Sequence, residues 1–280
     1  MNSLSDTFVL NSGKGIPCIG FGTWQTPDGE TAVNSVKYAI QSGYRHIDTA
    51  AIYGNEKSVG QGIRESGTDR SELFITTKLW NSDRGYEPAL KAFDTSLKKL
   101  GLDYIDLYLI HWPENKANSA KVNSDTWRAL EKLYRDGAVK SIGVSNFLEH
   151  HLRSLLDSAE TVPAVNQIEF HPGQMQHETV SFCKSNGILV EAWSPLGTGK
   201  MLNNPELAEI ALKYGKSVAQ LCIRWVLQNE VLPLPKSITP CRIEENTNVF
   251  DFEISCADMQ TINSMPYFGG SGLNPDTVTY

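Results

Sequence analysis

The chain has 280 residues, of which 40% are hydrophobic and 20% charged, and its formal net charge is −7. This is the composition of a globular protein with a sizeable core, and no apolar run approaches the roughly 18 residues of a membrane span. The sequence has no Lys/Arg-rich cluster, so it offers no electrostatic footprint for nucleic acid.

The predicted elements alternate between short β-rich runs and amphipathic helices. A hairpin is expected first, from TFVL (7–10) and IPCI (16–19) around Gly13 and Gly15. Eight further strand candidates follow, mostly rich in β-branched residues or Leu, as in a parallel sheet buried on both faces. They span 20–24, 44–48, 73–79, 105–111, 141–146, 164–170, 188–194 and 231–237.

Two of the intervening helices are readable from their apolar period. One is predicted to begin at Pro88 and to end at Gly101. The other follows Ser217, which is placed to form a capping box with Gln220. Eight strands with helices between them predict one (β/α)8 barrel domain over residues 1–280, with a hairpin before it and a short tail after it. A doubly wound open sheet uses the same alternation and is the alternative.

Nearly every strand candidate ends in a polar or ionisable side chain. In a (β/α)8 barrel the carboxyl ends of the strands converge on one mouth, where the active sites of this fold lie. We therefore expect these residues to share a site. They are Asp48, Lys78, His111, Ser145, Asn146, Gln167, Ser194 and Lys236.

Several familiar motifs are incomplete. Gly20-x-Gly22 lacks the third glycine of a dinucleotide fingerprint, because Gln25 stands at that position. GTGK (197–200) lacks the first glycine of a phosphate loop, which would fall at Ser194. There is no G-x-S-x-G for a serine-hydrolase elbow. The chemistry is therefore expected at the strand ends.

The cysteines and histidines indicate neither a disulfide framework nor a metal site. The five cysteines are scattered without a C-x-x-C, and no two histidines have the i, i+4 spacing of a helical zinc site. The first residues, MNSLSDTFVL, lack the basic and apolar regions of a secretory signal. We expect a cytoplasmic protein that uses no metal.

Six segments spread over the whole chain carry a resemblance to a known family. They are GYRHIDTAAIYGNEKSVG (43–60), IHWP (110–113), IGVSNF (142–147), NQIEFHP (166–172), AWSPLG (192–197) and PKSITPCRIEEN (235–246). In this order they resemble the characteristic segments of the aldo-keto reductases. The resemblance implies a (β/α)8 barrel that reduces aldehydes and ketones with NADPH, without a metal and without a Rossmann fingerprint.

The resemblance assigns four catalytic residues. Tyr53 would be the proton donor, Lys78 the cation beside it and Asp48 the carboxylate that pairs with the lysine, while His111 would orient the substrate carbonyl. A cation within ~4–6 Å lowers the pKa of a phenol, and a buried lysine stays charged only beside a partner such as a carboxylate. A neutral imidazole can donate a hydrogen bond to the oxygen that gains negative charge.

The resemblance also places the coenzyme. Ser145, Asn146 and Gln167 would bond the nicotinamide carboxamide, with Trp193 against the ring. An Arg fork with a Lys suits the dianionic 2′-phosphate, which favours NADPH over NADH. The remaining positions are Lys236, Ser237 and Arg242 at that phosphate, Glu245 and Asn246 at the adenine, and Ser194 and Leu196 at the pyrophosphate. Gly22 and Thr23 would approach the coenzyme from the loop after the first barrel strand, and Asp48 would also contact it.

The substrate cleft is expected to be aromatic. Trp24, Trp80 and Trp112 each follow a strand end and would surround the carbonyl together with Tyr53 and His111. The tail after Met265 would form the rim of the cleft, and its compact length resembles the small microbial members that act on α-dicarbonyls, keto sugars and simple aldehydes. We expect a monomer that takes a small-molecule carbonyl and binds neither nucleic acid nor membrane.

Two other functions share some of these features. Some barrels of the same family are non-catalytic NADPH-binding subunits of membrane channels, but here all four catalytic positions are occupied. Tyr53 and Lys57 in DTAAIYGNEK (48–57) have the Tyr-x-x-x-Lys spacing of short-chain dehydrogenases. The Gly-rich turn of that class is missing, and its tyrosine lies in the second half of the chain. We expect Lys57 to be solvated at the start of a helix.

Overall fold

The computed structural model describes residues 1–116 and 118–279, and in this part of the chain eight parallel strands follow one another around a barrel. A hydrogen bond from Gly22 N to Pro235 O (3.0 Å) joins the first strand to the segment after the last, so the two ends of the sheet meet. The barrel prediction is confirmed and the open sheet is wrong. The strands are β3 (Gly20–Gly22), β4 (His46–Asp48), β5 (Phe74–Leu79), β6 (Ile105–Ile110), β7 (Val139–Ser145), β8 (Val165–Glu169), β9 (Leu189–Trp193) and β10 (Leu232–Leu234).

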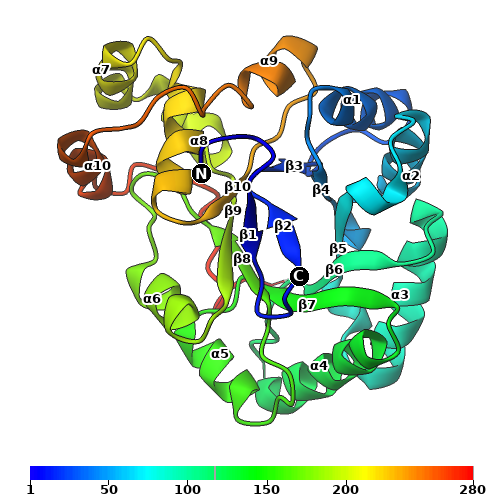
Figure 1. Ribbon diagram of the computed structural model, residues 1–280. Helices are drawn as coiled ribbons and strands as arrows, with labels where there is room; N and C mark the ends of the chain where they lie inside the picture. The colour runs from blue at the N-terminus through cyan, green and yellow to red at the C-terminus, as the bar shows by residue number, and fades with distance from the viewer. Residues whose placement is uncertain (117, 280) are drawn as a thin grey trace.

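Helices form a ring around these strands (Figure 1). The α-helices are α1 (Glu30–Gln41), α2 (Glu56–Glu65), α3 (Tyr86–Leu100), α4 (Ser119–Arg135), α5 (Glu149–Leu156), α6 (His177–Ser185), α7 (Pro205–Lys213), α8 (Val218–Gln228), α9 (Pro240–Glu245) and α10 (Cys256–Asn263). Short 3₁₀ turns are η1 (Ala51–Tyr53), η2 (Arg70–Glu72), η3 (Asn81–Asp83) and η4 (Gly197–Asn203). None of the described helices is long and apolar enough to cross a bilayer.

The predicted hairpin covers one end of the barrel. Its strands β1 (Thr7–Val9) and β2 (Gly15–Pro17) pair antiparallel, and Gly13 takes a positive φ of 78° in the turn between them. Figure 1 shows the hairpin in front of the centre of the barrel. Its buried Ile16 joins Leu107 and Val165 in an apolar cluster at the start of the barrel strands. The hairpin does not cover the opposite end of the barrel, where the strands terminate.

Most predicted boundaries differ from the observed ones by one or more residues, and two of these differences have a clear physical reason. α3 begins at Tyr86 and not at Pro88, because a proline fits anywhere in a first turn, where the backbone N–H has no helical partner. β10 spans only Leu232–Leu234, because Pro235 has no N–H with which to extend the ladder. The glycine at 101 ends α3 in the left-handed conformation, as predicted.

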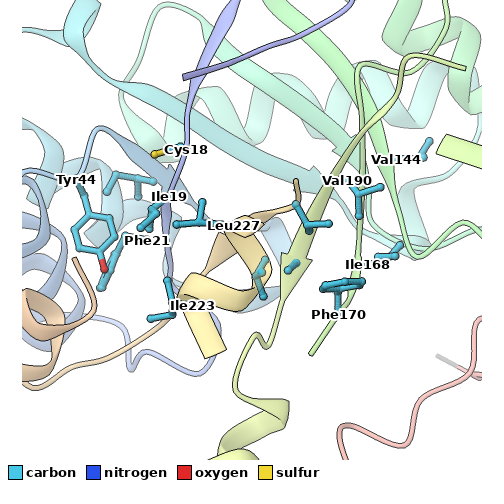
Figure 2. Packing of buried hydrophobic residues seen from close by; sticks show 14 of the residues in the cluster. Cys18, Ile19, Phe21, Tyr44, Val144, Ile168, Phe170, Val190, Ile223 and Leu227 are labelled. Atoms are coloured by element: carbon cyan, nitrogen blue, oxygen red, sulfur yellow. The ribbon is translucent and has the colours of Figure 1, made fainter. Parts of the chain in front are cut away.

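The capping box at the start of α8 is confirmed. Gln220 N donates to Ser217 Oγ (3.3 Å), and Ser217 N donates to Gln220 Oε1 (3.1 Å). Behind this start, α8 packs its apolar side chains into the main core. Figure 2 shows Ile223 and Leu227 of this helix close to Ile19 and Phe21 around β3. The box therefore fixes where a core helix begins.

The contact between α2 and α3 has no room for a side chain at Gly60. A Cβ atom there would lie 1.9 Å from Leu100 O, which is backbone and cannot move aside. We predict that Gly60→Ala lowers the free energy of unfolding by about 1–3 kcal/mol, the cost of overpacking. Urea denaturation would measure it. Gln61→Ala, on the exposed face of the same helix, should change little, and equal effects of the two would contradict the packing explanation.

Candidate active site

A cavity of about 900 Å³ opens at the carboxyl ends of the barrel strands. Eighteen of the twenty residues predicted for the site line it, and the two that do not are Thr23 and Lys78. The barrel thus brings the strand ends together as expected. The lining residues are Gly22, Trp24, Asp48, Tyr53, Trp80, His111, Trp112, Ser145, Asn146, Gln167, Trp193, Ser194, Leu196, Lys236, Ser237, Arg242, Glu245 and Asn246.

Lys78 lies fully buried beneath the cavity and uses all three of its ammonium hydrogens. Its Nζ is 2.6 Å from Asp48 Oδ1, 2.9 Å from Thr49 O and 3.3 Å from the hydroxyl oxygen of Tyr53. An ammonium group only donates, so the Tyr53 oxygen must be the acceptor in the last of these bonds. Lys57, by contrast, is exposed on α2.

The pKa of Tyr53 differs from the expectation. Burial raises it, and although Lys78 opposes that effect as predicted, the net direction is upward. Burial alone would lower the pKa of Lys78, but Asp48 and Tyr53 together outweigh it and raise that pKa. The resting pair at neutral pH is therefore a neutral phenol beside an ammonium, and the phenol keeps its proton.

His111 closes the same end of the cavity with an uncharged ring. Burial, and then the positive charges of Lys78 and Arg84, hold the pKa of His111 well below its usual value. Its ring stands edge-on to Tyr53 and to Trp80, with centroids 5.7 Å and 5.2 Å away. A neutral imidazole held this way can take part in a hydrogen bond to a molecule in the cavity.

Polar side chains from β7, β8 and β9 are bonded to one another beside this end. Asn146 donates to His111 O (2.9 Å) and Ser145 Oγ (3.0 Å), and it accepts from Trp193 Nε1 (2.8 Å). Gln167 donates to Asp48 Oδ2 (2.9 Å). These bonds fix one wall of the cavity before any ligand binds.

The far end of the cavity is cationic. Lys236 follows β10 and Arg242 lies on α9, and neither forms an ion pair with a carboxylate in residues 1–116 or 118–279. Ser237 also lines this cavity, as do Glu245 at the end of α9 and Asn246 directly after it. Two unpaired cations beside a hydroxyl suit a phosphate group, so this end fits the predicted 2′-phosphate.

The loop after β3 contributes less than predicted. The hydroxyl of Thr23 donates to Asp48 O (2.9 Å) and the residue is fully buried, so its side chain does not reach the cavity. Gly22 does line it, and a Cβ there would lie 3.3 Å from Leu234 O. The role of Thr23 is to hold the start of the loop against β4.

Comparison with known proteins agrees with this geometry. A sequence model of the Aldo/keto reductase family matches residues 18–266. The chain belongs to the aldo/keto reductase family. Glyoxal reductase of Bacillus subtilis (strain 168) is 53% identical over 278 residues, which cover 99% of each chain.

Two solved structures extend the comparison. An aldo-keto reductase enzyme from a Medee basin deep-sea metagenome library is 46% identical, with a TM-score of 0.93 over 98% of this chain and all of that one. The Bombyx mori aldo-keto reductase in complex with NADP is 38% identical, with a TM-score of 0.84 over 92% of each chain. The chain is thus an oxidoreductase of a family whose members bind NADP(H).

Some of the cavity in this aldo/keto reductase was not foreseen from the sequence. Ser217, Val218 and Ala219 line it, so the start of α8 faces the ligand space. The capping box was the available signal, because it marks a helix N-terminus. Thr198 and Gly199 of the GTGK segment line it as well.

Backbone strain is concentrated at this cavity. Among the described residues seven non-glycine positions have a positive φ, and four of them line it. A non-glycine residue with positive φ is uncommon, and such strained positions cluster at functional sites. The four residues are Gln25, Asn146, Ser194 and Thr198.

Aromatic residues line the part of the cavity where the substrate was expected. Trp24, Trp80 and Trp112 all line it, and Leu273 from the tail faces them across the opening. Trp24 is 40% exposed and Trp112 only 5%, so the aromatic surface runs from the rim into the depth of the cavity. Tyr280, the last residue of the predicted rim, lies outside the described part of the chain.

The tail is fastened by residues that sequence reasoning missed. Ser271 donates from N to Glu169 Oε1 (2.7 Å) and from Oγ to Glu169 Oε2 (2.6 Å). Asn115 donates to Pro275 O (3.0 Å), and Lys200 donates to Gly270 O (2.9 Å). The only signal in the sequence for this contact was Glu169, a carboxylate at the end of a buried strand.

Asp276 of the tail lies beside His150 and His151 of α5. These three residues are the one group of three potential metal ligands found among residues 1–116 and 118–279. His151 Nδ1 accepts from Leu148 N (3.2 Å), so its Nε2 carries the hydrogen and faces Asp276 Oδ1 at 3.3 Å. A protonated nitrogen cannot bind a metal. In this arrangement the group is a tail contact.

Removing one member of the buried ion pair should be costly. We predict that Asp48→Asn lowers the free energy of unfolding by about 3–5 kcal/mol, because it leaves Lys78 charged without a carboxylate. Adding Lys78→Met to that variant should cost far less than the sum of the single changes. Thermal and urea unfolding of the wild type, Asp48→Asn, Lys78→Met and the double variant would measure the coupling energy.

The exposed pair Lys132 and Asp136 (2.7 Å) is the matched control, and the same cycle there should give almost no coupling. Additive effects at Asp48 and Lys78 would contradict the ion pair as a buried interaction.

Proposed function

We propose that this enzyme reduces small aldehydes and ketones to alcohols with NADPH, with Tyr53 as the proton donor. One observation carries the proposal. The Tyr53 oxygen accepts from Lys78, so its own hydrogen is not used in that bond, and no described residue accepts it. Because Tyr53 lines the cavity, that hydrogen is available to a carbonyl oxygen inside it.

The cavity fits NADP(H), the coenzyme of the family. Lys236 and Arg242 would hold the 2′-phosphate at one end, and Gln167 and Trp193 would receive the nicotinamide at the other. When bound, the coenzyme supplies a hydride to the carbonyl carbon. Ser145 and Asn146 would fix which face of the ring is presented.

The protein's own residues would then handle the proton. Tyr53 would give its proton to the carbonyl oxygen, and Lys78 would stabilise the phenolate through the bond that it already donates. Asp48 would keep Lys78 charged. His111, neutral and packed edge-on against Tyr53, would orient the same oxygen.

The apolar lining of the opening and the relatives support small carbonyl substrates. Three tryptophans and Leu273 line the opening, and the relative that is 53% identical is a glyoxal reductase. We infer that α-dicarbonyls, simple aldehydes and keto sugars are the substrate class. A non-catalytic NADPH-binding role for the barrel would leave the Lys78–Tyr53 contact without a use, and NADPH oxidation on adding methylglyoxal would separate the two functions.

Tyr53→Phe removes only the proton donor. We predict that this variant binds NADPH as the wild type does and that its kcat for methylglyoxal falls by about 100- to 10,000-fold, the usual contribution of general acid catalysis. Fluorescence titration would give the binding constant, and NADPH absorbance the rate. Tyr104→Phe, outside the cavity-lining residues, should keep full activity. Wild-type turnover by Tyr53→Phe would overturn the mechanism.

Arg242→Ala tests the phosphate end. We predict that it weakens NADPH binding by about 10- to 100-fold, as expected for a charge-assisted hydrogen bond, and leaves NADH binding nearly unchanged. Isothermal titration of both coenzymes would measure this. Arg135→Ala, on a surface ion pair with Glu160, is the control. Equal losses for NADPH and NADH would refute the 2′-phosphate assignment.

A further inference from the structure

A second carboxyl group lies inside the barrel beneath the candidate active site. Glu191 of β9 is fully buried and does not line the cavity. Its Oε2 accepts a hydrogen bond from Gln167 Nε2 (2.8 Å), and its Oε1 has no partner among the described residues. The proposed proton transfer does not use it, so its presence in the core needs another reason.

Glu191 decides which way the Gln167 amide points. The same Nε2 also donates to Asp48 Oδ2 (2.9 Å), so both amide hydrogens go to carboxyl groups. Turning the amide over would bring its oxygen against both of them, which is repulsive. The side-chain oxygen of Gln167, Oε1, is therefore left over, and no described residue donates to it. Because Gln167 lines the cavity, this oxygen is available to a ligand there.

The charge of Glu191 is poorly compensated. The charged groups that face it are Asp48 from β4 and Lys78 from β5, which pair with each other, and the repulsion from Asp48 acts on Glu191 more strongly than the attraction from Lys78. Gln167 from β8 is neutral, and β10 places Leu232 beside Glu191. The remaining titratable group inside β4, His46, is uncharged because burial lowers its pKa to about 3.

Ionisation of Glu191 would thus add one unbalanced negative charge to the barrel interior. Burial, and then Asp48, raise the pKa of Glu191 to about 8. The pKa values of Tyr53 and Lys78 are shifted upward and that of His111 downward, so all three move away from the pKa of Glu191.

We propose that Glu191 is a positioning residue that links coenzyme binding to protonation. It holds the Gln167 amide with its oxygen toward the nicotinamide, and its carboxylate form favours the positively charged ring of NADP⁺ over the uncharged ring of NADPH. The inference rests on the proposed function, because that function puts the nicotinamide beside Gln167.

The sign of the effect follows from linkage. A positive ring favours the carboxylate, so NADP⁺ binding releases a proton from Glu191 and strengthens as the pH rises through its pKa. NADPH, with an uncharged ring, does not gain in this way. Both coenzymes carry the same 2′-phosphate, so its titration cancels in the ratio of their dissociation constants. If NADP⁺ lowers the pKa of Glu191 by one unit, the ratio changes by about tenfold over the full titration.

The experiment measures coenzyme binding and needs no turnover. Dissociation constants of NADP⁺ and NADPH are determined by quenching of protein fluorescence from about pH 6 to about pH 9, across the expected titration. For the wild type, we expect the affinity for NADP⁺ relative to NADPH to rise by about tenfold. Proton release on NADP⁺ binding in weakly buffered solution should accompany it. A ratio that does not change with pH would overturn the proposal.

Glu191→Gln separates charge from shape. The side-chain oxygen of the new glutamine can still accept from Gln167, so both coenzymes should bind, but the ratio should lose its pH dependence and no proton should be released. A Glu191→Gln protein with the wild-type pH profile would refute the role of Glu191. Glu191→Leu removes the acceptor as well and should weaken both coenzymes.

Glu56→Gln is the matched control. Glu56 is also a buried glutamate with one oxygen that forms no hydrogen bond; that oxygen lies 3.9 Å from Lys99 Nζ, and the other accepts from Thr77 Oγ1 (2.7 Å), but Glu56 does not contact Gln167. This variant should keep the wild-type pH profile. If it loses that profile as Glu191→Gln does, the effect is not specific and the proposal is wrong.

Failure of this inference and failure of the proposed function give different results. A pH-independent ratio with an inactive Tyr53→Phe would remove the role of Glu191 and leave the proton donor standing. A fully active Tyr53→Phe with the predicted pH-dependent ratio would do the reverse, because the ratio is read from binding alone.

Discussion

The three donor bonds of Lys78 are the constraint on which the site depends. They join β5 to β4 and to η1 across the wall of the barrel, and each one uses a hydrogen that the ammonium group cannot supply elsewhere. Burial of such a charge is tolerated only because Asp48 pairs with it. The same arrangement decides the hydrogen-bond direction at Tyr53, whose oxygen accepts from Lys78 and whose own hydrogen is not used in that bond.

The sequence predicted the barrel and most of its mouth for a simple reason. Strands buried on both faces are apolar along their length, so a polar residue such as Gln167 at the end of a strand stands out. Lys57 and Lys78 show the limit of this reasoning. Local spacing favours Lys57 as the partner of Tyr53, and only the parallel pairing of β4 with β5 brings Lys78 from the next strand into contact. The segment resemblance, not the spacing, identified Lys78.

Other features depend on contacts that no local pattern reveals. Glu191 was visible as a charge inside the apolar run at 188–194, but its link to Gln167 and Asp48 exists only where three strands meet. Glu169 likewise anchors Ser271, which lies about a hundred residues further along the chain. The hydroxyl of Thr23, a residue expected at the coenzyme, donates to the backbone of Asp48 and so holds the start of the loop against β4.

The unpaired Lys236 and Arg242 have a consequence for how a ligand arrives. The chain as a whole carries a net charge of −7, so an anion approaching it meets repulsion over most of the surface. Two cations at one end of the cavity, neither in an ion pair among the described residues, create a local attraction within that field, which favours the approach of a phosphate-bearing molecule to that end. Because dissolved salt screens such attraction beyond about 10 Å, the rate of encounter should depend on ionic strength far more than the chemistry that follows.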